Sequence, residues 1–294
     1  MSGLALGGVL LSALLHATWN TAAKESGHPT AFLLAMEAAS LVLFLPVLLF
    51  GFHPSEIPEV VWGLLVATGL AHALYGYSLS RGYAHGDLSL VYPIARSTPA
   101  LVPLVAVPLL GESVSLQGAL GIALVVSGMW AVQTDGRLEP RQLFSLGAAF
   151  AYLTLITTVG YSIFDKLAME RLAHASWTGR APRALVYMCL MQAFYLPGFL
   201  ALSLRSIAAR EVWQVFRSAR LRVAAAGSFG VSSYALILYT LQSSPVSYVT
   251  AVRQISVLFA VAMGVIWLRE RPGPVRLAGA AANVAGVALI AASG

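Results

Sequence analysis

Two arginines lie inside long apolar stretches of the sequence. Arg96 lies in "DLSLVYPIARSTPALVPLVAVPLLGE" and Arg253 in "PVSYVTAVRQISVLF". A guanidinium binds a carboxylate or phosphate through two parallel hydrogen bonds, and a permanent charge at membrane depth is costly unless it has a use or a partner. We therefore interpret Arg96, and with it Arg253, as groups that bind the anionic part of a small molecule. The alternative is an arginine that snorkels or is paired internally and only holds helices together.

Other polar and aromatic residues share helical faces with one another. Tyr92 lies one turn before Arg96, and Pro93 between them should bend the helix. His16 and Asn20 are also one turn apart, which puts them on one face. Interhelical hydrogen bonding is the competing interpretation for these residues. The predicted substrate-binding residues are Arg96, Tyr92, Trp19, Asn20, Tyr75, His72, Arg253 and Tyr161.

Glu37, in "FLLAMEAASLVLF", is the one acid well inside an apolar stretch. Such a carboxyl can gain and lose a proton during a functional cycle, and His16 is a second titratable candidate. We predict that Glu37 and His16 couple function to protons. A fixed salt bridge from Glu37 to Arg96, Arg253 or Lys24 is the alternative.

Other reactive residue types have no pattern that indicates chemistry. Acids are sparse, and no histidine pair has the spacing of metal ligands with an acid nearby. The stretch "GESVSLQG" lacks the lysine of a phosphate-binding loop. We interpret Asp165 and Lys166 as interface residues at the end of a span, and Cys189 as a small buried apolar residue. The sequence predicts no enzyme, no metal and no cofactor.

The composition indicates which elements position these residues. Of 294 residues, 58% are hydrophobic and only 10% are charged, against about 25% charged in soluble domains. Apolar stretches of about 20 residues indicate transmembrane helices. We predict ten, at 4–23, 30–51, 60–80, 88–110, 114–132, 143–164, 184–204, 221–241, 246–268 and 275–293. The stretch 4–23 lacks the features of a cleaved signal peptide, so we expect a retained helix. The predicted fold class is an all-α integral membrane protein.

The second half of the sequence repeats the first. A shift of 158 positions places Glu112 on Glu270, and it also aligns Gly121 with Gly279 and Gly128 with Gly286. We predict two five-helix repeats, 1–136 and 137–294. Because five is odd, the second repeat must enter the membrane from the opposite side, as in secondary transporters. The alternative is a chance alignment of glycine-rich helices. The glycines of 114–132 and 275–293 should permit close helix contact.

The sequence resembles the EamA family of the drug/metabolite transporter superfamily. The resemblance rests on the ten spans, on the short "GE" and "RE" loops before each last helix, and on "LLHATWNTAAK" and "GDLSLVYPIAR". It implies two bundled repeats around a central cavity that opens alternately to the two sides, with coupling to protons or to the substrate gradient. Small relatives keep an acid in the first helix for cationic drugs. The stretch 4–23 has none, which argues against cationic drug export.

The positive charges predict a topology. The net charge of +6 comes from arginines in short loops, which indicates membrane orientation and not nucleic-acid binding. One set of loops carries most of them and should be cytoplasmic, which leaves both termini outside; the resemblance implies the opposite. The richer set is Lys24, Arg81, Arg137, Arg141, Arg205, Arg210, Arg217, Arg220, Arg222, Arg269, Arg271 and Arg276, and the other is Lys166, Arg171, Arg180 and Arg183.

Taken together, these features predict a secondary active transporter of the bacterial inner membrane. It would move a small anionic or zwitterionic metabolite, such as an amino acid, an organic acid or a phosphonate-like compound. The expected partners are this substrate, the lipid bilayer and protons, with no nucleic acid, and the chain would be a monomer or a homodimer. The alternatives are a membrane-embedded enzyme and a non-transporting membrane scaffold.

Overall fold

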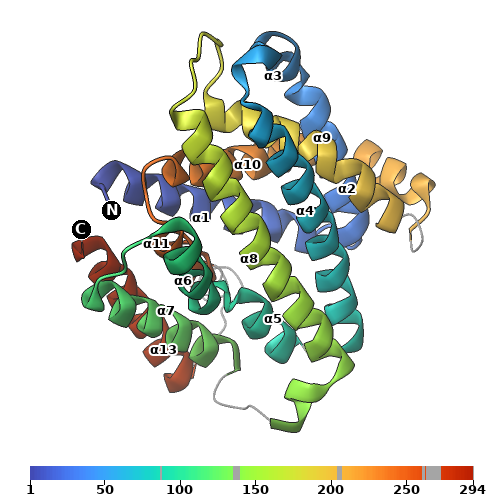
Figure 1. Ribbon diagram of the computed structural model, residues 1–294. Coiled ribbons are helices and arrows are strands. Elements are labelled where there is room, and N and C mark those ends of the chain that lie inside the picture. Colours follow the sequence, from blue (N-terminus) through green and yellow to red (C-terminus); the bar gives the residue numbers. More distant parts are fainter. Residues whose placement is uncertain (87, 135–139, 204–206, 260–261, 263–272, 294) are drawn as a thin grey trace. The chain divides into compact units, whose positions relative to one another are not determined.

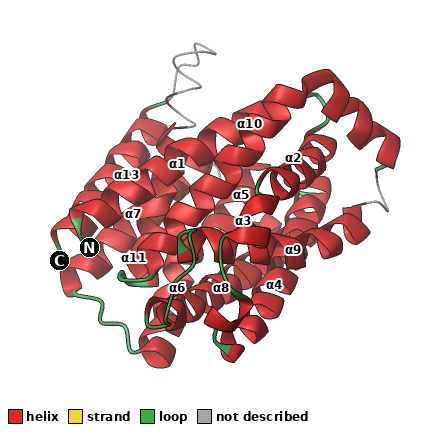
Figure 2. Ribbon diagram, turned by 90° about the horizontal axis from the view of Figure 1, so that it is seen from above, coloured by secondary structure: helices red, strands yellow, loops and turns green. Residues whose placement is uncertain are grey.

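The computed structural model describes residues 1–86, 88–134, 140–203, 207–259, 262 and 273–293, and these residues form helices, turns and loops without a strand (Figures 1 and 2). The α-helices are α1 (Gly3–Lys24), α2 (Pro29–Leu43), α3 (Leu45–Phe50), α4 (Glu59–His85), α5 (Leu88–Arg96), α6 (Thr98–Leu110), α7 (Leu116–Thr134), α8 (Leu146–Ala173), α9 (Arg183–Ser203), α10 (Ala209–Leu241), α11 (Val246–Val252) and α13 (Pro274–Ala292). The short 3-10 helices are η1 (Pro54–Glu56), η2 (Pro140–Phe144) and η3 (Arg253–Ile255).

Nine of the ten predicted spans are confirmed as helical segments long and apolar enough to cross a membrane, within the part of the chain that the structure describes. The tenth, 246–268, is described to Phe259 as a shorter apolar helical segment, and most of its remainder lies outside the described residues. The two largest errors in the predicted span ends are in α8 and α10. Helix α8 continues to Ala173 and not 164, and α10 begins at Ala209 and not 221. Asp165 and Lys166 therefore lie inside α8 and not at its end.

The chain forms two compact units, and each takes segments from both predicted repeats. Unit 1 comprises Met1–Ala13, Leu74–Ile163 and Ser244–Gly294, and unit 2 comprises Leu14–Ala73 and Phe164–Ser243. Helices α1, α4 and α8 each contribute residues to both units. The predicted repeat boundary between 136 and 137 falls outside the described residues, so it stays a prediction.

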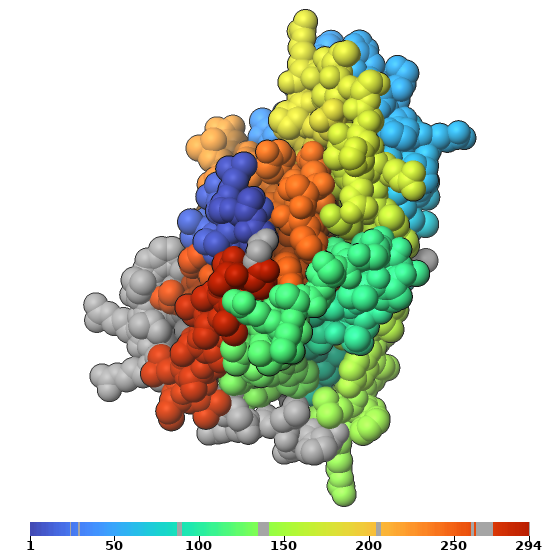
Figure 3. Space-filling model, turned by 60° about the vertical axis from the view of Figure 1, so that its left-hand side comes forward, coloured from blue at the N-terminus to red at the C-terminus, as the bar shows by residue number. Residues whose placement is uncertain are grey.

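In unit 1, α7 and α13 lie side by side, and glycines bring their backbones together (Figures 1 and 3). A Cβ atom on Gly128 would lie 2.5 Å from the carbonyl oxygen of Gly279, and one on Gly286 would lie 2.5 Å from that of Gly121. The fully buried Asn283 donates from Nδ2 to the carbonyl oxygen of Val125, 3.5 Å away. The close contact expected from these glycines is confirmed, and it depends on the missing side chains.

Glu112 ties the end of α6 to the start of α11, also in unit 1. Its Oε1 accepts from the backbone N–H of Val246 at 2.5 Å, and its Oε2 accepts from the hydroxyl of Ser247 at 2.7 Å. The first N–H groups of a helix have no partner within it and favour a negative charge. The glutamate that marks the repeat in the sequence thus caps a helix of the other predicted repeat.

Unit 2 is built around α2, which packs against α10 and α9. Phe32 and Met36 of α2 are buried with Val223 of α10 in one apolar cluster. Two loops close one end of the unit. The carboxylate of Glu56 accepts hydrogen bonds from the backbone N–H and the hydroxyl of Thr178. These bonds lower the pKa of the Glu56 carboxyl below its ordinary value of 4.5, and the bond from the Thr178 hydroxyl has the largest effect.

The glycine contact between α7 and α13 predicts a specific sensitivity to one methyl group. Gly128→Ala should destabilise the protein by about 1–3 kcal/mol, because the new Cβ meets the backbone of α13, which cannot move aside cheaply. Thermal unfolding of the detergent-purified protein measures the loss. Gly7→Ala in α1 is the control, since a Cβ there has no neighbour within 4 Å and alanine favours a helix. Equal melting temperatures for the two variants would contradict the packing described here.

Candidate functional site

Arg96 lies where a membrane helix is interrupted. It is the last residue of α5, and α6 begins two residues later at Thr98. Pro99 follows in the first turn of α6; it has no N–H to bond the carbonyl of Ala95, and its ring disfavours a continuous helix. Pro93 was predicted to bend the helix, but it lies inside α5 and the break comes after Arg96. The proline that breaks the helix is therefore Pro99.

Two side chains fix the geometry of this break. The hydroxyl of Ser97 donates to the carbonyl oxygen of Pro93 at 2.8 Å, and it accepts from Nε1 of Trp130 in α7, also at 2.8 Å. Neither residue was predicted to belong to a site. A serine beside an arginine and ahead of a proline is a weak signal, and Trp130 lies on another helix.

In the predicted repeat alignment, Arg253 lies one residue from the position of Arg96. Helix α11 ends at Val252, and the 3-10 helix η3 begins at Arg253. Interrupted helices in corresponding positions of two repeats are typical of the binding sites of secondary transporters. Arg253 itself has right-handed helical angles and the helical segment continues to Phe259, so this is a short 3-10 stretch and not a break like the one after Arg96.

Tyrosines surround Arg96 in unit 1. Its guanidinium lies 5.1 Å from the ring centroid of Tyr92, so the shared face predicted for these two residues is confirmed. The rings of Tyr75 and Tyr161 meet edge to face with centroids 5.9 Å apart. Both arginines lie within electrostatic range of Tyr161. The structure therefore brings five predicted site residues, Arg96, Arg253, Tyr92, Tyr75 and Tyr161, into one unit. Arg96 and Arg253 are half-buried there, not sealed in a core.

The other predicted site residues belong to unit 2. On α1, the amide of Asn20 donates to the backbone carbonyl of His16 at 2.7 Å, and the ring of His16 meets Trp19 edge to face at 4.9 Å. The amide nitrogen of Asn20 is thus engaged by its own helix. Within unit 2, Glu37 accepts at Oε2 from Nε2 of Gln192 at 2.6 Å. Its described partner is an amide of α9 and not one of the cations suggested by the sequence.

Asp165 forms the most elaborate hydrogen-bond cluster in unit 2. The side chain is fully buried in α8. Oδ1 accepts from the hydroxyls of Thr68 at 2.7 Å and Tyr187 at 2.9 Å, and Oδ2 accepts from that of Tyr234 at 2.5 Å. His72 lies on the same side of α4 as Thr68, with Nδ1 2.9 Å from the Thr68 carbonyl oxygen and 3.3 Å from its hydroxyl. Three hydroxyl donors satisfy a carboxylate that water does not reach.

This cluster was not predicted from the sequence. Its donors come from three helices, α4, α9 and α10, and Asp165 lay just beyond the predicted end of its span. Its neighbour Lys166 pairs with Glu170, 3.0 Å away, and donates to the carbonyl oxygen of Leu241 at 2.9 Å. The interpretation of both residues as interface residues missed the network around Asp165.

We predict that the Asp165 cluster contributes to stability. Tyr234→Phe should destabilise the protein by about 1.5–3 kcal/mol, because a hydrogen bond to a charged acceptor is lost in a buried place. Tyr239→Phe on the same helix is the matched control, since Tyr239 is 51% exposed. Thermal unfolding compares the two variants, and indistinguishable melting temperatures would show that the Tyr234 hydroxyl is not needed to satisfy Asp165.

Comparisons with known proteins agree with this architecture. The EamA-like transporter family matches twice, at residues 3–134 and 145–292. An "Uncharacterized transporter in cobO 3'region" of Sinorhizobium sp. is 33% identical over 75 residues, which is 26% of this chain and 53% of that protein. The chain thus aligns with about half the length of this relative. A solved structure titled "Crystal structure of protein" has a TM-score of 0.66 at 18% identity, covering 99% of this chain and 96% of the other, and it supports the fold.

The two family matches cover nearly all of the described helices, and the resemblance seen in the sequence is confirmed. The protein is an all-α, multi-pass membrane protein, and it belongs to the EamA-like transporter family.

Proposed function

We propose that the protein moves a small anionic or zwitterionic metabolite across the bacterial inner membrane by alternating access. One observation carries the proposal. Arg96 lies at a helix interruption, Arg253 lies one residue from the aligned position of the other half, and both arginines belong to unit 1 and influence Tyr161 electrostatically. A carboxylate or phosphonate suits a guanidinium, because the planar fork matches two acceptor oxygens.

The tyrosines add to this selectivity. The ring of Tyr92 lies 5.1 Å from the guanidinium carbon of Arg96, a distance that permits a cation–π interaction. Tyr75 and Tyr161 form an aromatic pair with phenol groups that can bond to a polar substrate. An amino acid, an organic acid or a phosphonate-like compound fits such a site. Trp19, Asn20 and His72 belong to unit 2, and their role in substrate binding stays a proposal from the sequence.

Alternating access is proposed from the repeat. The family matches the chain once in each predicted half. Five predicted spans in each half would insert the two halves into the membrane in opposite orientations. In inverted-repeat transporters, one repeat usually rocks against the other and so opens the binding site to each side in turn. The boundary between 1–136 and 137–294 remains part of this proposal, as do the monomeric or homodimeric state and the side of the termini.

Protons are the proposed coupling ion. Glu37 and His16 were predicted from the sequence for this role. The geometry adds the pair Asp165 and His72 as a stronger candidate, because Thr68 contacts both of them and His72 is only half-buried. Protonation of Asp165 would weaken the hydrogen bonds that its carboxylate accepts from three hydroxyls. Because these hydroxyls lie on α4, α9 and α10, the change would affect all three helices together with α8.

The Arg96 site predicts the result of an uptake experiment. Proteoliposomes with the wild-type protein should take up one or more anionic or zwitterionic compounds, first selected because they raise the melting temperature of the purified protein. Arg96→Gln should reduce this uptake about 10–100-fold, because a charged hydrogen-bond pair is worth about 1.5–3 kcal/mol. Arg96→Lys keeps the positive charge but loses the planar guanidinium with its two parallel hydrogen bonds. Its uptake should therefore lie between those of the wild type and Arg96→Gln.

Arg81→Gln is the control for charge, since Arg81 is an exposed arginine of the same unit. It should leave uptake unchanged. Uptake that survives Arg96→Gln for every transported compound would remove the arginine from the substrate site. Hydrolysis or transfer without uptake would favour the membrane-embedded enzyme, and neither uptake nor turnover would favour the scaffold.

A further inference from the structure

Helix α10 is longer than a membrane span requires. Its 33 residues would extend about 50 Å at 1.5 Å per residue, whereas the hydrocarbon core of a bilayer is about 30 Å thick. Ala219 has non-helical angles (φ −137°, ψ 32°) and divides the helix at a kink. The apolar span predicted from the sequence begins at Leu221, which would place the segment Ala209–Ser218 outside the hydrocarbon, at the membrane surface.

This surface segment is amphipathic. Val215 is buried, and it packs with Val212 and Phe216 on the apolar cluster that contains Phe32 of α2. The opposite face exposes Arg210, Trp213, Gln214 and Arg217. Trp213 is 60% exposed and stacks on Phe216 with ring centroids 5.6 Å apart. Tryptophan and arginine on the outward face of such a segment are typical of helices that lie in the membrane interface.

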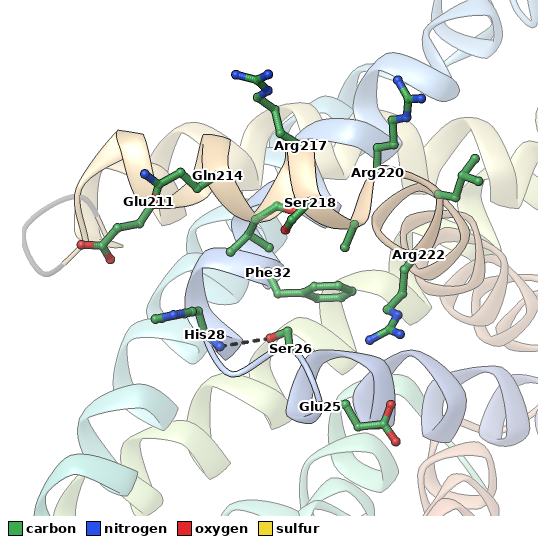
Figure 4. Close-up of a pocket in the computed structure, with 13 residues that line it drawn as sticks. Glu25, Ser26, His28, Phe32, Glu211, Gln214, Arg217, Ser218, Arg220 and Arg222 are labelled. Atoms are coloured by element: carbon green, nitrogen blue, oxygen red, sulfur yellow. Dashed lines mark hydrogen bonds between the residues drawn. The ribbon is translucent and has the colours of Figure 1, made fainter.

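A cavity of about 710 Å³ adjoins the segment, and all its lining residues belong to unit 2. Phe32 and Val215 line it with apolar surface, and Ser26 and His28 line it from the turn after α1. Figure 4 shows Arg217 and Arg220 extending outward from α10, while Arg222 extends toward Glu25. The lining thus joins apolar surface to a basic rim.

Three arginines lie close together around the kink at Ala219. Arg217, Arg220 and Arg222 follow one another within six residues around the kink. Of the two lining acids, Glu211 lies at the far end of the segment from Arg220 (Figure 4), so only Glu25 lies near the arginines. Leu221, between Arg220 and Arg222, is 82% exposed. A ligand held there would meet cations and an apolar surface together.

We propose that this end of α10 binds the head group of an anionic phospholipid. Arg217 and Arg220 would bind its phosphate, and the exposed apolar side chains of Trp213 and Leu221 would contact the upper part of its acyl chains. A lipid fits better than a free phosphate, because the basic rim lies at the start of a membrane span beside exposed apolar groups. The segment also belongs to the arginine-rich loop set, which the positive-inside bias places on the cytoplasmic face, where anionic lipids are abundant.

A lipid titration of the detergent-purified full chain tests the proposal without measuring transport. Dioctanoylphosphatidylglycerol should raise the melting temperature with a saturable dependence on concentration. Dioctanoylphosphatidylcholine at the same concentrations should raise it much less. Arg217→Gln and Arg220→Gln should each increase the half-saturating concentration of the anionic lipid about five-fold, because an arginine near an anionic surface contributes about 1 kcal/mol.

Three controls make the test specific. Arg217→Lys should restore the half-saturating concentration to within about two-fold of wild type, since the attraction depends on charge. Arg180→Gln removes an exposed arginine from the opposite loop set and should have no effect. Inorganic phosphate should not reproduce the shift. The proposal is overturned if phosphatidylcholine or inorganic phosphate stabilises the protein equally, or if Arg180→Gln weakens binding as much as Arg217→Gln.

Discussion

The cost of a guanidinium at membrane depth is the constraint on which the rest of the structure depends. An arginine in the hydrocarbon costs about 2.5–3.5 kcal/mol even by the mildest measure. At Arg96 a helix ends, and the ring of Tyr92 lies within cation–π distance of the charge, 5.1 Å from the guanidinium carbon to the ring centroid. Ser97 and Trp130 hold the interruption in place. Such an arrangement has a clear use when a solute with the opposite charge enters.

The polar groups are divided between the two units in a way that suits transport. Unit 1 holds both arginines, and Glu112, its sole acid among the described residues, accepts hydrogen bonds at the start of α11. Unit 2 holds the half-buried Glu37 and the buried Asp165. The proposed function assigns solute binding to unit 1 and proton binding to unit 2, and helices α1, α4 and α8 contribute residues to both units. We infer this division of roles from the chemistry of the residues.

The membrane helices could be predicted because their signal is local. A stretch of about 20 apolar residues has few other uses, so nine spans were located within a few residues at most ends. The errors occurred where polar residues continue a helix past the apolar stretch, at Asp165 in α8 and at Ala209–Arg220 in α10. In the second case Val212, Val215 and Phe216 have the spacing of a buried helical face, but the arginines around them resembled a loop.

The site could be predicted only in part, for the same reason. Arg96 and Tyr92 lie one turn apart, and the sequence shows this directly. The donors to Asp165 lie on α4, α9 and α10, and no local spacing relates Thr68, Tyr187 and Tyr234. Asn20 had a suitable residue type, but its own backbone satisfies its amide nitrogen. Spacing within one helix predicts which residues share a face, and it does not predict which helices those faces meet.

The most direct test is to replace the charge of Arg96 and restore it chemically from water. An Arg96→Cys variant, made with Cys189→Ser so that it carries a single thiol, is treated in proteoliposomes with a cationic, membrane-impermeant methanethiosulfonate. The account predicts that the thiol reacts, that a transported anion slows the reaction, and that the restored positive charge recovers part of the lost uptake. The account would be contradicted if the thiol of the folded protein did not react when the reagent was added on either side of the membrane, and reacted only after denaturation.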